Sequence, residues 1–185
     1  MSDIGWVPKN MMILKMTPGE YAEIAKHLVQ ADSDEERAAF LFARQIDNQT
    51  LQVDRVRVPD RSAYEGASWE YLELRDGLLG ELIREAHILG TALVEAHSHP
   101  FDGSEATQFS AIDIDGLEET APHVVWRLPG RPFAAFVFGR KRFDSLYWNS
   151  RSSAPNGVVQ IQIGSELLAP TGLSLGHAKG THGSI

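Results

Sequence analysis

An unbroken run of small and apolar residues at positions 38–43, Ala-Ala-Phe-Leu-Phe-Ala, constrains the fold more than any other stretch of the chain. The run has no polar position, so a strand formed from it would present apolar side chains on both of its faces. Such a strand must lie inside a sheet that is covered on both sides. We therefore predict a buried central strand here, with helices packed against the sheet.

The segments around this run alternate between strand and helix patterns. Short apolar or alternating stretches predict strands at residues 11–14, 51–58, 69–74, 91–99, 123–128, 132–139, 143–148 and 158–163. Helical spacing of apolar residues predicts helices at residues 17–30, 76–89 and 111–120. This order of elements predicts a mixed α/β fold, in which helices flank a mixed sheet.

Local signals define the ends of two helices. The stretch Thr17-Pro18-Gly19-Glu20 combines an N-cap, a proline in the first turn and the acid of a capping box, and Gly90 is placed as the C-terminal cap of the second helix. His27 falls off the apolar stripe of the first helix and is expected to face solvent. Residues 59–67 are expected to form a loop, and the broken alternation at 54–56 predicts a bulge or an edge position.

The length of 185 residues suits one domain. From Thr171 onward the chain is rich in Gly, Ser, Thr and His and has almost no apolar anchors. We therefore expect one domain over residues 1–170 and a flexible tail over 171–185. His177 and His182 lie in that tail and are not expected to bind a metal.

Composition excludes several classes of function. The net charge of −8 argues against a surface for nucleic acid or anionic membrane. The basic stretch Arg140-Lys141-Arg142 lies between two strand-like runs and predicts a solvated hairpin turn. The absence of cysteine excludes disulfides, thiolate catalysis and cysteine-based zinc sites. The start of the chain does not resemble a signal peptide and no apolar run is long enough to span a membrane, so we expect a cytoplasmic location.

Two imidazoles and a carboxylate at a strand end could bind one zinc ion. His97 and His99 are two residues apart, so they point the same way on a strand, and Pro100 then ends regular pairing. Asp113 would supply a third, anionic ligand and leave the fourth tetrahedral position to water, as in catalytic zinc sites. Such a water becomes a nucleophile near neutral pH.

Other interpretations of these residues stay open on the sequence alone. The pattern Ser110-x-x-Asp113 is also a helix-capping pattern. The stretch 101–109 lengthens the path to Asp113, which makes Asp102, Glu105 and Asp115 conceivable substitute ligands. Glu95 shares the strand face of His97 and is a rival base, although a salt bridge or an exposed acid is the role we expect for it. Glu36 alone would more often be a solvated carboxylate.

Together these residues resemble the motif of the JAB/MPN zinc metalloproteases, a distant Glu followed by His-x-His-Pro and Ser-x-x-Asp. The likeness covers roughly residues 10 to 150 and rests on matching residues in the family's order: Glu36, His97, His99, Pro100, Ser110 and Asp113. The interval from His99 to Asp113 exceeds the family's usual spacing by a few residues, an insertion that a loop tolerates at modest entropic cost.

The resemblance implies a JAB/MPN-type fold, a mixed sheet flanked by helices as in cytidine deaminases. It implies one Zn²⁺ per chain held by His97, His99 and Asp113. It assigns Glu36 the role of accepting a proton from the attacking water and delivering it to the departing amine. Ser110 would donate to the oxyanion that forms on the scissile carbonyl.

The expected function is that of a compact prokaryotic member, similar to the deubiquitinase-like peptidases encoded with bacterial ubiquitin-like conjugation systems, some of them antiviral. The expected reaction is zinc-dependent hydrolysis of a peptide or isopeptide bond after the C-terminal glycine of a ubiquitin-like protein. Expected partners are that modifier and its conjugates, with E1-like and E2-like proteins of the same system. A non-catalytic JAB/MPN scaffold is the alternative, and a role in DNA metabolism is less attractive because the chain is acidic.

Overall fold

The computed structural model describes residues 11–30, 33–67, 72–100, 103 and 105–180. Its elements in chain order are β1 (Met11–Met16), α1 (Pro18–Leu28), β2 (Ala38–Gln45), β3 (Thr50–Arg57), η1 (Arg61–Ala63), β4 (Tyr64–Ala67), β5 (Leu72–Leu74), α2 (Leu78–Leu89), β6 (Ala92–Ser98), α3 (Ala111–Arg127), β7 (Phe133–Phe138), β8 (Phe143–Trp148), β9 (Val158–Ile163), β10 (Glu166–Leu168) and α4 (Leu173–Gly180). Among the described residues, no helix combines the length and apolarity needed to cross a membrane.

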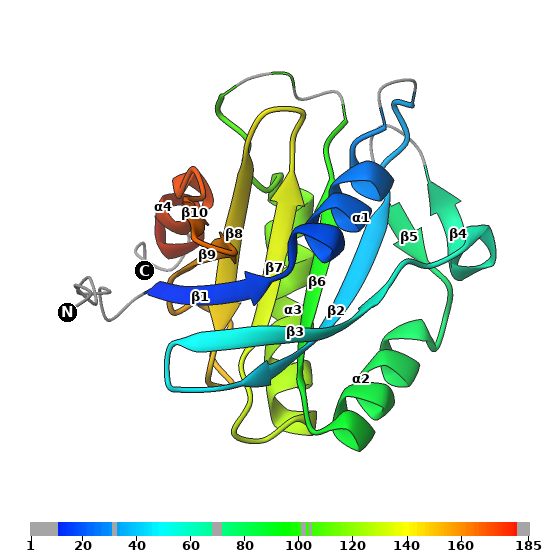
Figure 1. Cartoon of the computed structure of the whole chain (residues 1–185). Coiled ribbons are helices and arrows are strands. Elements are labelled where there is room, and N and C mark those ends of the chain that lie inside the picture. Colours follow the sequence, from blue (N-terminus) through cyan, green and yellow to red (C-terminus); the bar gives the residue numbers. More distant parts are fainter. Residues whose placement is uncertain (1–10, 31–32, 68–71, 101–102, 104, 181–185) are drawn as a thin grey trace.

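The main sheet has eight strands in the order β10-β9-β1-β3-β2-β6-β7-β8, and β4 and β5 form a separate pair. The pairs β1–β3, β1–β9 and β6–β7 are parallel and the others are antiparallel, so the sheet is mixed. Its ends curl toward each other: Ser145 Oγ of β8 donates to the Val159 carbonyl of β9 (2.7 Å) and accepts from the Val159 N–H (2.9 Å). The predicted mixed α/β class is confirmed (Figure 1).

Residues 38–43 form the buried core of β2, as predicted. Alternate side chains from this run enter two separate apolar clusters. Ala38, Phe40 and Phe42 pack with residues of α2 and α3, whereas Ala39, Leu41 and Ala43 pack with residues of α1. The sheet therefore separates α1 from α2 and α3, as Figure 1 shows.

Most of the predicted local signals are confirmed. Thr17 and Glu20 form the capping box of α1, and Gly90 ends α2 with a positive φ of 70°. The bulge lies at Asp54, which is skipped where β3 pairs with β2. The prediction for His27 is wrong, because the ring is half-buried and its Nε2 lies 2.9 Å from the Ala38 carbonyl oxygen at the start of β2.

Two predictions of backbone class are also wrong. Residues 123–127, expected as part of a strand at 123–128, belong to α3, and Leu128 is its C-cap. Ala121, Val124, Val125 and Leu128 are buried at helical spacing despite the two valines. The stretch 59–67 is not all loop, since it contains η1 and β4. The expected strand at 69–74 is observed as β5, and residues 69–71 lie outside the described part of the chain. The hairpin turn at 140–142 is confirmed between β7 and β8.

The segment expected to be a loose tail contains the helix α4 from residue 173. The carboxylate of Asp144, on β8, accepts hydrogen bonds from the N–H groups of Gly172 (2.9 Å) and Ser174 (2.8 Å), and Ser174 is buried. The domain thus extends past residue 170. His177 is exposed on α4, and His182 lies outside the described residues.

Candidate metal centre

His97 lies near the carboxyl end of β6, in the interior of the sheet. Its backbone pairs with Ala38 of β2 on one side and with Val137 of β7 on the other. His99 follows the strand, and its N–H donates to the Phe138 carbonyl at the end of β7 (2.9 Å). Hydrogen bonds to neighbouring strands therefore fix the backbone of both histidines.

The antiparallel pairing of β2 and β6 places Glu36 across from His99. The Ser98 N–H donates to the Arg37 carbonyl (3.0 Å), and the Arg37 N–H donates to Ser98 Oγ (3.1 Å). The segment before β2 and the end of β6 therefore stay side by side beyond the regular pairing. Glu36 is 5% exposed, and its Oε1 lies 3.6 Å from His99 Nε2. Glu36 is thus a buried acid of the site and not a solvated one.

Asp113 approaches both histidines. Its Oδ1 lies 3.5 Å from His97 Nε2, and its Oδ2 lies 3.2 Å from His99 Nε2. One potential ligand atom from each of the three residues lies within 4.8 Å of the other two. The structure therefore brings together the three residues that the sequence put forward as metal ligands.

The start of α3 explains how Asp113 is aimed. Ser110 is the N-cap, and its Oγ accepts from the Asp113 N–H (3.2 Å), while the Asp113 carboxylate accepts from the Ser110 N–H (2.7 Å). The pattern Ser110-x-x-Asp113 is thus a helix cap, and the same cap turns the carboxylate toward the histidines. Because Ser110 Oγ accepts in this bond, its hydroxyl proton can donate into the neighbouring pocket.

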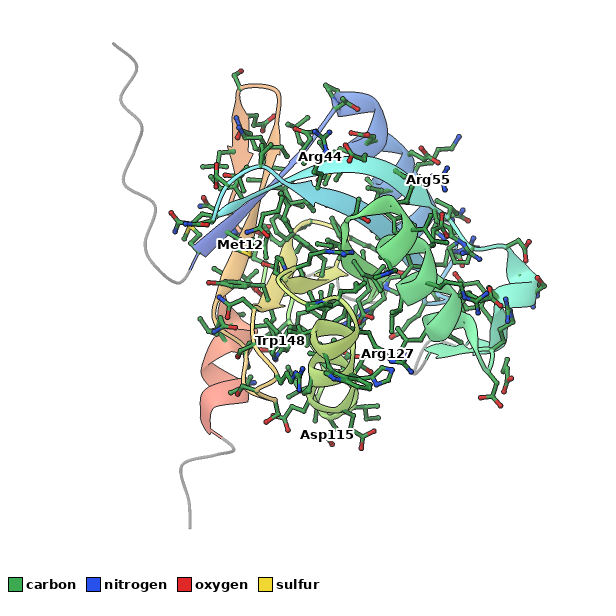
Figure 2. The ribbon with its side chains drawn as sticks, turned by 90° about the horizontal axis from the view of Figure 1, so that it is seen from below. Met12, Arg44, Arg55, Asp115, Arg127 and Trp148 are labelled. Atoms are coloured by element: carbon green, nitrogen blue, oxygen red, sulfur yellow. The ribbon has the colours of Figure 1, made fainter. Side chains whose placement is uncertain are left out.

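Two of the three alternative ligands lie elsewhere. Glu105 is exposed and forms ion pairs with Lys141 (3.7 Å) and Arg142 (3.6 Å) of the β7–β8 turn. Asp115 is exposed on the outer side of α3, as Figure 2 shows. Asp102 lies outside the described residues.

Electrostatics links the acids to the imidazoles. Burial opposes ionisation of Asp113, but the two histidines hold the pKa of its carboxyl well below the ordinary range. Burial also disfavours a charged His97, yet attraction to Asp113 and to the acids Glu36 and Glu95 raises its pKa. Burial raises the pKa of Glu36, which suits a group that must accept and then release a proton.

Glu95 does not have the role expected from the sequence. It is half-buried, and within the described part of the chain it forms no ion pair with lysine or arginine. It lines the same pocket as His97, and burial raises its pKa to about 7. The expected salt bridge or exposed acid is therefore corrected to an unpaired acid inside the site.

These residues surround one pocket with a volume of about 280 Å³. One wall comes from β2 and β6, a second from α3, and a third from Leu74 at the end of β5. Ser110, Asp113 and the largely exposed Ile112 lie at the start of the α3 wall. Two of the candidate metal ligands, His97 and Asp113, therefore line an open pocket, together with Glu36 and Ser110.

Contacts that link distant parts of the chain support the loop between His99 and α3. Arg140 Nε donates to the Pro100 carbonyl (2.6 Å), and Thr171 Oγ1 donates to the Thr107 carbonyl (2.6 Å). Phe109 packs near His97, with ring centroids 5.6 Å apart. These supports could not be predicted from the sequence, because partners 40 and 64 residues apart leave no local pattern.

The donor set suits zinc. Neutral imidazoles and one carboxylate are ligands that zinc commonly takes, and they can complete three of four tetrahedral positions. His97 Nε2 is buried without a hydrogen-bond partner among the described residues, since its distance to Asp113 is that of a loose ion pair. A buried nitrogen that lacks a hydrogen bond and lies close to two other ligand atoms is one that a metal ion would satisfy.

Comparisons with protein-family models and with curated protein sequences give no match for this chain. The function of this chain is therefore inferred from the geometry of the site and from the resemblance of its motif.

Proposed function

We propose that the chain is a zinc-dependent peptidase or isopeptidase of the JAB/MPN type, which hydrolyses the bond after the C-terminal glycine of a ubiquitin-like protein. One observation supports this most: His97, His99 and Asp113 converge beside Glu36 and Ser110 at the edge of an open pocket. Three protein ligands with an open side are typical of catalytic zinc, whereas structural sites are closed by four.

The side chains divide the chemistry among them. Zinc held by His97, His99 and Asp113 would lower the pKa of a bound water and polarise the scissile carbonyl. Glu36 accepts the proton of the attacking water and passes it to the departing amine. The Ser110 hydroxyl donates to the carbonyl oxygen as negative charge develops there.

The pocket suits an extended chain with small side chains. Ala38 and Gly116 contribute to its walls, so backbone can approach closely where a glycine tail would lie. Leu74 belongs to β5, which pairs with β4 on one side. Its other edge could add a substrate strand, a common way of gripping a modifier tail.

The proposal implies a set of partners. The substrate would be a ubiquitin-like protein as a precursor or joined to a target, and E1-like and E2-like proteins of the same bacterial system would make the conjugates. We include in this proposal that the conjugation system has an antiviral role.

The first test measures zinc per chain and cleavage of a ubiquitin-like protein fused through its C-terminal glycine to a reporter. Wild-type protein is expected to bind one zinc and release the reporter. Glu36→Gln should keep zinc and lose roughly 100-fold or more in rate, the usual contribution of a positioned general base. Glu35→Gln is the matched control, because it removes the same charge from the exposed neighbouring residue.

Two results would contradict the proposal. If Glu36→Gln cleaves as fast as Glu35→Gln, Glu36 is not the base. If the wild-type chain binds no zinc and cleaves nothing, a scaffold of this fold becomes the better interpretation.

A further inference from the structure

The pocket extends beyond the candidate metal ligands into a recess between β6 and α3. Glu95 is two residues before His97 on the same face of β6, which places its Cα about 7 Å farther along the strand. The remaining wall residues of the recess are apolar or small and uncharged: Phe40, Leu74, Gly116, Leu117 and Thr120. Glu95 is therefore the charged group of the recess.

The α3 wall of this recess leaves room for a ligand. Asp113, Gly116 and Thr120 follow one another at helical spacing along the wall. A Cβ placed on Gly116 would meet no other atom within 4 Å. Gly116 is exposed, so this part of the α3 wall is open to solvent and has space for a ligand group.

Glu36 and Asp113 each lie within 4 Å of a histidine nitrogen, whereas Glu95 forms no such pair among the described residues. A doubly charged zinc ion would be balanced by Asp113 and Glu36, the two acids beside the histidines. No lysine or arginine among the described residues pairs with Glu95. The oxygens of a carboxyl group in a half-buried, mostly apolar recess need a partner, which a bound cation with N–H donors would supply.

We propose that this recess binds a positively charged side chain, lysine or arginine, that the substrate carries close to the scissile bond. The inference rests on the proposed peptidase function and adds a substrate class to it. Glu95 supplies the charge, Phe40 and Leu117 contact the alkyl part of the side chain, and Gly116 leaves the space. A substrate with a neutral residue at that position would lose this contact.

A binding experiment tests the recess without any cleavage. The probes are n-butylguanidinium and its neutral isostere n-butylurea, titrated into zinc-loaded protein while backbone amide NMR signals of Leu74, Gly116 and Thr120 are followed. We expect the cation to bind at least about tenfold more tightly than the urea, with both dissociation constants taken from the shifts of these signals, as a charge-assisted contact requires. Equal binding of the two probes, or no binding of the cation, would overturn the inference.

Variants assign the effect to Glu95. Glu95→Gln should bind both probes equally weakly while keeping one zinc per chain, and the matched control Glu119→Gln, on the exposed side of α3, should behave as wild type. Gly116→Leu should block the recess by size. If Glu95→Gln loses zinc, the residue supports the metal ligands and the inference is wrong; the wild-type comparison decides the matter if the variant does not fold.

Cleavage separates this inference from the proposed function. Gly-Gly-containing peptides that differ only by lysine or norleucine, placed in turn on each side of the scissile bond, are compared by kcat/KM. At one position lysine should be favoured at least about tenfold, and Glu95→Gln should remove the preference. Cleavage without a preference for lysine would overturn the inference about the recess but not the proposed peptidase function. Absence of all cleavage would count against the peptidase function, and the probe titration would then decide whether the recess binds a cation.

Discussion

The backbone N–H of Phe109 donates to the buried hydroxyl of Ser174, with 2.9 Å between nitrogen and oxygen. Ser174 lies in the first turn of α4, and its own N–H donates to Asp144 of β8 (2.8 Å). Phe109 immediately precedes Ser110, the cap that aims Asp113. The C-terminal helix therefore holds the loop that leads into the candidate metal centre.

Ser174→Ala should weaken both the fold and the metal centre. The change leaves the buried Phe109 N–H unpaired, which costs about 1–3 kcal/mol. We expect that loss in urea unfolding of the metal-free protein, together with weaker zinc binding in a chelator competition. Ser165→Ala, at an exposed position between β9 and β10, is the control. Equal zinc affinity in the two variants would show that α4 does not position Asp113.

Asp144→Asn should loosen α4. The carboxylate accepts from three N–H groups, those of Ser145 (2.8 Å), Gly172 (2.9 Å) and Ser174 (2.8 Å), and an amide replaces one acceptor oxygen with a donor. We expect faster hydrogen exchange of residues 172–178 and a loss of about 1–3 kcal/mol in the free energy of unfolding. Unchanged exchange in this segment would mean that other contacts hold the helix.

Local signals made much of the fold predictable. Capping at Thr17 and Gly90 depends on a few neighbouring residues, and the apolar run 38–43 determines a buried strand by itself. The valines at 124 and 125 misled the prediction, because β-branched residues favour strands while burial against the sheet favoured a longer α3. The helix α4 was not predicted, because its segment is rich in Gly, Ser, Thr and His and its position depends on the distant Asp144.

The site was predictable to the extent that its residues are close in sequence. The two histidines share a strand, and Ser110 and Asp113 share a helical turn, so each pair has a recognisable spacing. The buried state of Glu36 depends on pairing between β2 and β6. Glu95 was misjudged because no spacing shows that α3 and β5 enclose its side of the strand.

Asp113→Ala and Asp115→Ala should differ in zinc affinity, because only Asp113 is a candidate ligand. Asp113 lies beside both imidazoles, so its removal should weaken zinc binding by more than about 100-fold, beyond the effect of losing a group that merely orients a ligand. Asp115 is exposed two residues later, and its variant should bind zinc as wild type does. Zinc affinity measured by chelator competition decides between them. A larger loss in Asp115→Ala would reverse the assignment.

Without metal, the pair of Asp113 and His97 should stabilise the protein over a limited pH range. The lowered pKa of Asp113 contributes stability above the ordinary value of 3.8 and is lost as the pH falls below it. The raised pKa of His97 contributes stability below the ordinary value of 6.5 and is lost as the pH rises through its higher folded value. Both contributions are complete only between these two values.

Asp113→Asn should therefore destabilise the metal-free protein most between pH 3.8 and 6.5, by about 1.5–3 kcal/mol, and less at higher pH where His97 is neutral. Zinc should act in the opposite direction, because His97 must lose its proton to bind the ion. Urea unfolding of both proteins across this range, with and without zinc, measures the two effects. A difference between wild type and variant that does not change with pH would contradict the ion pair, and zinc stabilisation that grows as the pH falls would contradict binding through His97.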